Sequence, residues 1–146
     1  YAHKDVSSVH LRVMPDIAKA WRDDARGERW KKIRAIRLDI TGHIEGLRTA
    51  KKIGSSAEIR VQIHPGTKEI EQLLDSIDMA EICIVSSSEI MPLDNEQGTR
   101  YTVTKIEEHQ KCERCWQYLP DVGANKNHPT VCVRCAEAVE QVKLAA

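Results

Sequence analysis

Four of the five cysteines in this 146-residue sequence form two C-x-x-C pairs near its C-terminal end. Sixteen residues separate the pairs, whose members are Cys112, Cys115, Cys132 and Cys135. Zinc takes four tetrahedral ligands, prefers thiolate among them, and is commonly held by paired knuckles at this spacing. Four thiolates leave no coordination position open to a substrate. The pattern therefore predicts one structural Zn²⁺ per chain and no metal-based catalysis.

Two other interpretations of the same cysteines remain open from the residues alone. Two disulfides would require an oxidising compartment, and the sequence begins with nothing that resembles a secretory signal. A thioredoxin-like motif needs one C-x-x-C pair at the start of a helix and would leave the second pair without a role. No run of the sequence approaches the roughly 20 apolar residues of a membrane span. We therefore expect a cytoplasmic chain without a membrane partner, and its first residue, Tyr1, indicates a piece of something longer.

Basic and aromatic side chains lie beside the cysteines. Lys111, Arg114, Trp116 and Arg134 are each within one residue of a cysteine in the sequence. An exposed indole next to cations is an arrangement that stacks on unpaired bases while the cations contact phosphates. The alternative is that Trp116 and Tyr118 only supply apolar area to a small metal-centred fold. His109 and His128 lie nearby, but four cysteines already complete the ligand set, so both histidines are expected at or near the surface.

The net charge is zero, but the charges are segregated along the chain. Residues 1–52 carry 13 Lys/Arg and 7 Asp/Glu, residues 53–104 carry 3 and 9, and residues 105–146 carry 6 and 6. A polyanion such as RNA would be attracted to the first segment and repelled by the second. Alternatively, the two segments attract each other, or both are simply solvated faces.

Three segments with different patterns must position the cysteines. Residues 17–52 are expected to form one long helix, because apolar residues recur there every three or four positions. This stripe comprises Ile33, Ile36, Ile40, Ile44 and Leu47. Lys51 and Lys52 suit the negative C-terminal end of a helix, and Gly54 suits its cap.

The middle segment has the pattern of a small α+β unit. The expected elements are a strand over 57–64 that buries Ile59, Val61 and Ile63, a helix over 67–77 capped by Thr67, and strands over 80–87 and 100–107. Residues 87–98 are expected to be a flexible insertion, and Cys83 is expected to be a buried, inert thiol. The predicted fold class is α+β: helical residues 1–52, a small α+β domain over 53–104 with a short sheet, and a four-cysteine zinc ribbon or finger over 105–146.

The sequence contains no recognisable catalytic motif. It has neither a Gly-rich phosphate-binding loop nor a nucleophile elbow, so no catalytic residue is predicted within it.

The sequence resembles the C-terminal region of bacterial isoleucyl-tRNA synthetases. CERCWQYLPDVG and HPTVCVRCAEAV are similar to the zinc module of that family, and SVHLRVMPD together with KIRAIRLDITGHIEGLRTAKKIGSSAEIRV resembles the end of its anticodon-binding region. The resemblance implies a fragment of an ATP-dependent isoleucine–tRNA ligase whose catalytic and editing domains lie upstream. It also implies that the four cysteines hold zinc and that ATP is bound only by the full-length enzyme.

The resemblance further implies partners and contacts. The expected partners are the anticodon stem-loop of a tRNA and the remainder of the synthetase chain, within a monomer. Arg114 and Trp116 are expected to touch anticodon bases, and Lys111 and Arg134 to follow phosphates. The alternative is a structural zinc-ribbon cap that packs on the rest of a larger protein without touching RNA. A third possibility is a stand-alone nucleic-acid protein, since some DNA glycosylases end in a similar finger, but their upstream motifs are missing here.

Overall fold

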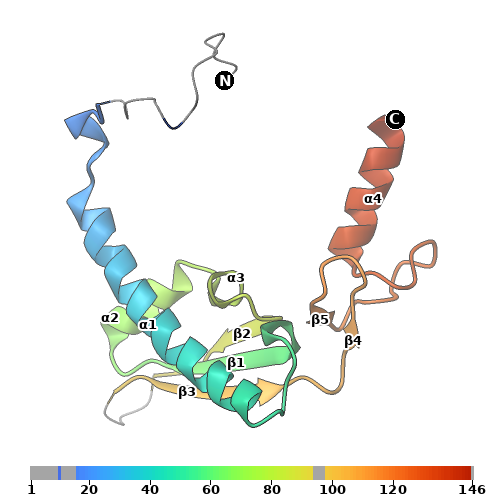
Figure 1. Cartoon of the computed structure of the whole chain (residues 1–146), viewed down its shortest axis with the longest axis horizontal. Helices are drawn as coiled ribbons and strands as arrows, with labels where there is room; N and C mark the ends of the chain where they lie inside the picture. Colours follow the sequence, from blue (N-terminus) through green and yellow to red (C-terminus); the bar gives the residue numbers. More distant parts are fainter. Residues whose placement is uncertain (1–9, 11–15, 94–97, 146) are drawn as a thin grey trace.

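A computed structural model of the chain describes residues 10, 16–93 and 98–145, without the side chains of 143–145 (Figure 1). The segment SVHLRVMPD lies almost wholly outside the described residues, as does part of the predicted insertion. The remainder confirms the predicted α+β class: one long helix, a three-stranded sheet with two short helices, and a four-cysteine module at the C-terminal end. Among the described residues, no helix combines the length and apolar character that crossing a membrane requires.

The long helix α1 spans Asp24–Thr49 and buries the predicted isoleucine stripe. It begins later than predicted, because the Asp23 side chain accepts a hydrogen bond from the backbone N–H of Arg26 at 2.9 Å and so caps the helix. Within residues 16–23, a 3₁₀ turn, Lys19–Trp21, precedes it.

The end of α1 differs from the prediction. Lys51 adopts a left-handed conformation with φ of 56°, and the N–H groups of Lys51 and Lys52 bond to the carbonyls of Arg48 and Leu47. This is a Schellman-type ending built on lysine in place of glycine. Gly54 is therefore not the cap of α1. Its N–H donates to the Glu58 carboxylate at 3.0 Å, as part of the next turn.

Strand β1, Ile59–His64, is the centre of the sheet. It pairs in parallel with β2, Ser87–Ile90, and antiparallel with β3, Arg100–Lys105. The alternation read from the sequence is confirmed, since Ile59, Val61 and Ile63 are all buried. They join the isoleucines of α1 in one apolar cluster, so the sheet is covered by α1 on one face (Figure 1).

Two helices connect β1 to β2. Helix α2 spans Lys68–Asp75 and is capped by Thr67, as predicted. Helix α3 spans Met79–Cys83, where a strand over 80–87 was predicted, and that prediction is wrong. Asp78 starts the helix by accepting from the N–H groups of Ala80 and Glu81, and Ile84 ends it with φ of 57°. The strand itself comes later and occupies residues that were assigned to the flexible insertion.

The C-terminal part has its own small elements. Strands β4, Gln110–Lys111, and β5, Tyr118–Leu119, form a two-stranded antiparallel pair, and helix α4 spans Val133–Ala145. The apolar cluster here is separate from the main one. It is made mostly of cysteine, with Leu119, Val122 and Val131 packed around it. So little apolar area cannot by itself offset the entropy of ordering the segment.

Two glycines allow a matched test of the packing of the main α+β part of the chain. A Cβ on Gly66 would lie 2.5 Å from the carbonyl carbon of Gly98 and 2.7 Å from the backbone nitrogen of Thr99, whereas a Cβ on Gly42 within α1 meets nothing within 4 Å. We expect Gly66→Ala to lower the free energy of unfolding by about 1–3 kcal/mol, because backbone must move. Gly42→Ala should raise it by about 0.5–1 kcal/mol through helix propensity. Urea unfolding of both variants at saturating zinc is the measurement, and equal stabilities would contradict the packing of Gly66.

Candidate metal centre

The structure brings the four cysteines of the two knuckles together. Their sulfur atoms all lie within 4.8 Å of one another, and the pair from Cys115 and Cys132 is 3.9 Å apart. The first two cysteines follow β4, and the last two lie at the start of α4. Three of the four are fully buried, and Cys115 is partly exposed.

This geometry fits a tetrahedral metal and does not fit disulfides. Zinc–sulfur bonds of about 2.3 Å place tetrahedral sulfurs about 3.8 Å apart, close to the observed 3.9 Å. A disulfide needs about 2.05 Å, and all five cysteines are free thiols. Zn²⁺ bound by these four sulfurs would be coordinatively closed and would supply a cross-link between two chain segments.

The first knuckle is shaped by backbone hydrogen bonds around a strained residue. The N–H of Trp116 donates to the carbonyl of Cys112 at 2.8 Å, and the N–H of Cys112 donates to the carbonyl of Gln117 at 2.9 Å. This tight turn requires Trp116 to adopt φ of 65°, a left-handed conformation that a bulky residue rarely takes. The turn directs both sulfurs of the knuckle to one side.

The second knuckle depends on Asp121 and Gly123. The Asp121 carboxylate accepts a hydrogen bond from the N–H of Val133, the first residue of α4, at 3.0 Å. It thereby satisfies one of the free N–H groups at that helix start. Gly123 has φ of 87° and donates to the carbonyl of Val131, which returns the loop toward the metal ligands. The D-V-G triplet thus positions Cys132 and Cys135, a role that the sequence analysis did not assign.

The thiol pKa values show why a cation is needed. The pKa of Cys132 is raised to about 12, mainly by burial and also by hydrogen bonds with the neighbouring thiols. Burial also opposes ionisation of Cys112, but backbone N–H groups of the knuckles outweigh it and lower the pKa of this thiol to about 6. One thiolate thus forms readily and makes the next one less favourable. A divalent cation removes this conflict, because thiolates that coordinate a metal are deprotonated outright.

The predicted RNA-contacting residues surround the cysteines, but they do not all point outward. Trp116 is 62% exposed, and the Lys111 ammonium lies 5.5 Å from the centre of its ring. The guanidinium of Arg114 donates to the sulfur of Cys135 at 3.6 Å, and that of Arg134 donates to the side-chain oxygen of Gln117 at 3.3 Å. Arg114 therefore uses part of its donors on a metal ligand, and Arg134 uses part of its donors on the neighbouring Gln117.

The histidines and the fifth cysteine lie outside the ligand cluster. His109 lies 3.8 Å from Glu108, and His128 lies 3.7 Å from Glu140, both measured from Nε2 to a carboxylate oxygen. Cys83 belongs to the main core and is 4% exposed. Burial raises the pKa of its thiol to about 11, against a smaller opposing effect of Arg37. The prediction of a buried Cys83 is confirmed.

Sequence reasoning missed the residues that dock the module on the sheet. Ser86 is 6% exposed, and its hydroxyl donates to the carbonyl of Ala57 and accepts from the N–H of Tyr118. The side chain of Gln117 donates to the carbonyl of Val85 at 3.4 Å. A polar cavity of about 420 Å³ lies along this junction, lined in part by Glu81 and Arg134. Ser86 is the first of three consecutive serines after an apolar run, and this pattern gives no signal of such a role.

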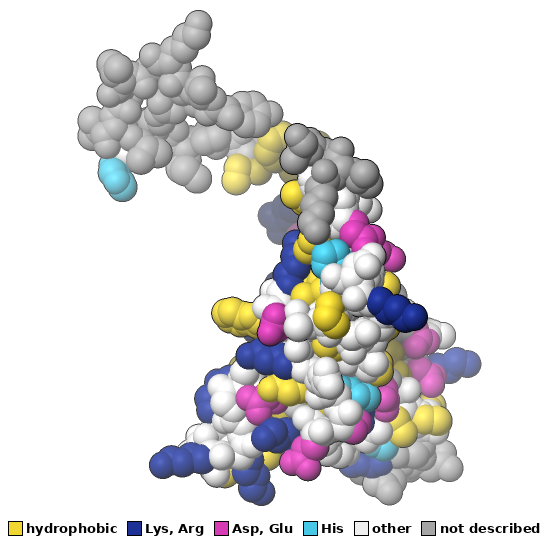
Figure 2. Space-filling view, turned by 90° about the vertical axis from the view of Figure 1, so that its right-hand side faces the viewer, with side chains coloured by type: hydrophobic (Ala, Val, Ile, Leu, Met, Phe, Trp, Pro, Cys, Tyr) yellow, Lys and Arg dark blue, Asp and Glu magenta, His cyan; other side chains and the backbone are white. Residues whose placement is uncertain are grey.

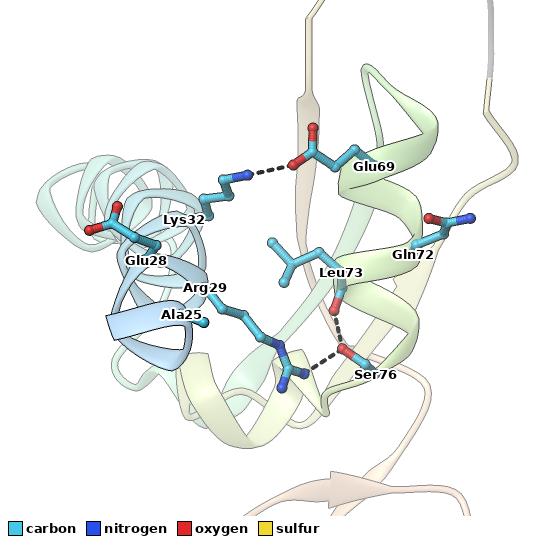
Figure 3. A pocket seen from close by; sticks show the side chains of 8 residues that line it. All are labelled: Ala25, Glu28, Arg29, Lys32, Glu69, Gln72, Leu73 and Ser76. Atoms are coloured by element: carbon cyan, nitrogen blue, oxygen red, sulfur yellow. Dashed lines mark hydrogen bonds and ion pairs between the residues drawn. The ribbon is translucent and has the colours of Figure 1, made fainter. Parts of the chain in front are cut away.

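A second open cavity lies between α1 and α2 (Figure 3). Lys32 pairs there with Glu69, and Arg29 donates to the Ser76 hydroxyl at 2.6 Å. The figure shows these two cations reaching from α1 across to α2, on either side of Leu73. Part of the basic segment is thus engaged with the acidic one, as the alternative interpretation of the charge segregation holds. Figure 2 shows basic, acidic and single apolar side chains interspersed on another face of the molecule.

Comparisons with known proteins agree on the family. A family described as a zinc finger found in FPG and IleRS matches residues 110–138. The isoleucine–tRNA ligase of Agrobacterium fabrum (strain C58) is 34% identical over 148 residues, which is 96% of this chain and 15% of that protein. The isoleucine–tRNA ligase of Mesorhizobium japonicum is 34% identical over 97% of this chain, and that of Thermoanaerobacter sp. (strain X514) over 96%. The chain spans about 15% of the length of such relatives.

Removal of the metal should unfold the module and spare the sheet. Structural zinc contributes on the order of 10–16 kcal/mol, and the module has almost no other core, whereas the isoleucine cluster is separate. After chelation, we expect amides of residues 110–138 to lose protection from hydrogen exchange while those of β1 keep it. Added zinc should restore the protection. A module that stays protected without metal would contradict a zinc-dependent fold.

Alkaline pH should destabilise the main core through Cys83. Its folded pKa of about 11 is above the ordinary value of 9.0, so the fold favours the neutral thiol. This contribution is complete below pH 9 and declines as the pH rises toward 11. We expect Cys83→Ala to show a smaller decline in unfolding free energy over that interval than the parent chain, measured by urea unfolding at each pH. Identical pH profiles would contradict the shift.

Proposed function

We propose that this chain is the C-terminal, tRNA-binding part of an isoleucine–tRNA ligase. The premise is that the chain is homologous, along nearly all of its length, to a segment of these ligases. The full-length enzyme would use ATP to charge its tRNA with isoleucine in the cytoplasm, as a monomer. Its active site would lie in the part of the enzyme that this chain does not span. Within the chain, zinc at Cys112, Cys115, Cys132 and Cys135 would be structural, since four sulfurs close its coordination shell.

The observation that carries the RNA-binding proposal is the environment of Trp116. A large apolar ring that is 62% exposed contributes little to packing of the module. The knuckle nevertheless holds it in a left-handed backbone conformation, which costs on the order of 1–3 kcal/mol for such a residue. The Lys111 ammonium at 5.5 Å from the ring adds positive charge beside it. An exposed ring with an adjacent cation suits a stacked base and its phosphate.

The arginines would extend this surface. A guanidinium has five N–H donors, so the contact of Arg114 with Cys135 leaves donors for a base, as the resemblance implies. Arg134 would contribute to phosphate binding in the same way while it donates to Gln117. The helix α1 would add cations along the anticodon stem. Several of these are in exposed ion pairs, which are worth so little that phosphates can replace the acidic partner.

A second candidate function is a structural cap, and the junction at Ser86 favours it. The module is attached to the sheet through hydrogen bonds of Ser86 and Gln117, so it already has a protein surface on which it packs. A cap would continue this packing onto the rest of the synthetase without touching RNA. Hydroxyl-radical footprinting of the zinc segment with and without tRNA separates the two, because only the first function predicts protection around Trp116.

Substitution of Trp116 should weaken binding of an anticodon stem-loop. Stacking on an aromatic ring is worth about 1–3 kcal/mol per base, so we expect Trp116→Ala to raise the Kd between about 5-fold and 150-fold. The measurement is a titration of the zinc-loaded chain with a fluorescent stem-loop at fixed salt. Trp21→Ala is the matched control, since Trp21 is 78% exposed but lies outside the zinc module. Equal affinities of the two variants would exclude the stacking role.

A further inference from the structure

The two knuckles carry the same residue at the same place. Each has the form C-x-R-C, with Arg114 before Cys115 in the first and Arg134 before Cys135 in the second. The charge is thus repeated at the position that directly precedes the last sulfur of each pair. Because four thiolates meet at this site, the role of each arginine depends on which sulfur atom it contacts.

Each arginine reaches toward the opposite knuckle, one by direct contact and the other through a glutamine. The Nη1 atom of Arg114 lies 3.6 Å from the sulfur of Cys135. In the reverse direction, Arg134 donates from Nη2 to the Gln117 side-chain oxygen, and that oxygen lies 3.7 Å from the sulfur of Cys115. The last sulfur of each pair is therefore linked to the arginine of the other pair, directly for Cys135 and through Gln117 for Cys115.

The charges of the centre explain why this matters. Zn²⁺ with four thiolates carries a net charge of about −2, and three of the four cysteines are fully buried. Charge taken out of water is costly unless it is paired and hydrogen-bonded. Arginine is permanently protonated and offers directed N–H donors, so two guanidinium groups return the local sum to about zero. Hydrogen bonds to metal ligands are known to support metal affinity.

We propose that Arg114 and Arg134 are reciprocal positioning residues of the metal centre: Arg114 contacts the last sulfur of the opposite knuckle directly, Arg134 reaches it through the side chain of Gln117, and both support the thiolate ligands that hold zinc. The two knuckles are thereby tied together through charge as well as through the ion. This role rests on the zinc occupancy proposed above, but it does not depend on RNA. It also gives the arginines a function when no tRNA is bound.

The test is zinc retention by the full chain, measured by competition with a chromophoric chelator at fixed pH. We expect Arg114→Gln and Arg134→Gln each to weaken zinc binding by about 10-fold, the low end for outer-shell partners, because both side chains are largely exposed. Lys126→Gln is the matched control: it removes one positive charge from an exposed position in the same module. Arg→Lys variants keep the charge and should recover part of the loss.

Salt separates charge stabilisation from packing. The difference between the Arg→Gln variants and Lys126→Gln should shrink at about 1 M salt, where the Debye length is about 3 Å, whereas a packing defect would persist. Arginine variants that match Lys126→Gln in affinity, or whose loss is unchanged by salt, would overturn the proposal. If an Arg→Gln variant fails to fold at excess zinc, the corresponding Arg→Lys variant decides, and its failure too would overturn the role of charge. An unmodified chain that binds no zinc would instead refute the metal assignment itself.

Discussion

The fold of the C-terminal part depends on two pairs of sulfur atoms held around one point. Its apolar cluster consists mainly of the cysteines themselves, with three aliphatic side chains around them. Without a cation, the four thiols cannot all ionise together, as the raised pKa of Cys132 and the lowered pKa of Cys112 indicate. When a cation is bound, the same closely spaced sulfur atoms serve as its four ligands. The metal thus takes the place that a hydrophobic core has in the rest of the chain.

The module is nevertheless not independent of the sheet. One buried hydroxyl, that of Ser86, bonds to Ala57 on one side and to Tyr118 on the other. The two halves therefore share a polar joint between two separate apolar clusters. Such a joint fixes orientation more than it adds stability, because a satisfied hydrogen bond contributes only about 1 kcal/mol net. The position of Trp116 relative to α1 and the sheet depends on this joint.

Sequence reasoning succeeded where a pattern has one physical cause. The isoleucine spacing in α1 and the alternation in β1 each have a single periodic explanation, and both faces are buried as predicted. The knuckle spacing likewise brought four sulfurs together. It failed at residues 80–87, because a short apolar run fits a strand or a buried helical turn equally well. There the deciding features were local: the cap at Asp78 and the left-handed Ile84. A local feature also decided the end of α1, where the left-handed Lys51, and not Gly54, terminates the helix.

The same reasoning could identify the residue types that surround the knuckles, but not the directions in which their side chains point. Lys111, Arg114, Trp116 and Arg134 were all grouped as one RNA-facing set, because sequence proximity does not tell which way a side chain turns. In the structure, Trp116 is largely exposed, whereas Arg114 reaches the sulfur of Cys135 and Arg134 reaches the side chain of Gln117. Stability alone explains the arginines, since they offset buried negative charge. It does not explain Trp116, whose strained and exposed indole also has a cation beside it, so the presence of this residue calls for a partner beyond the chain.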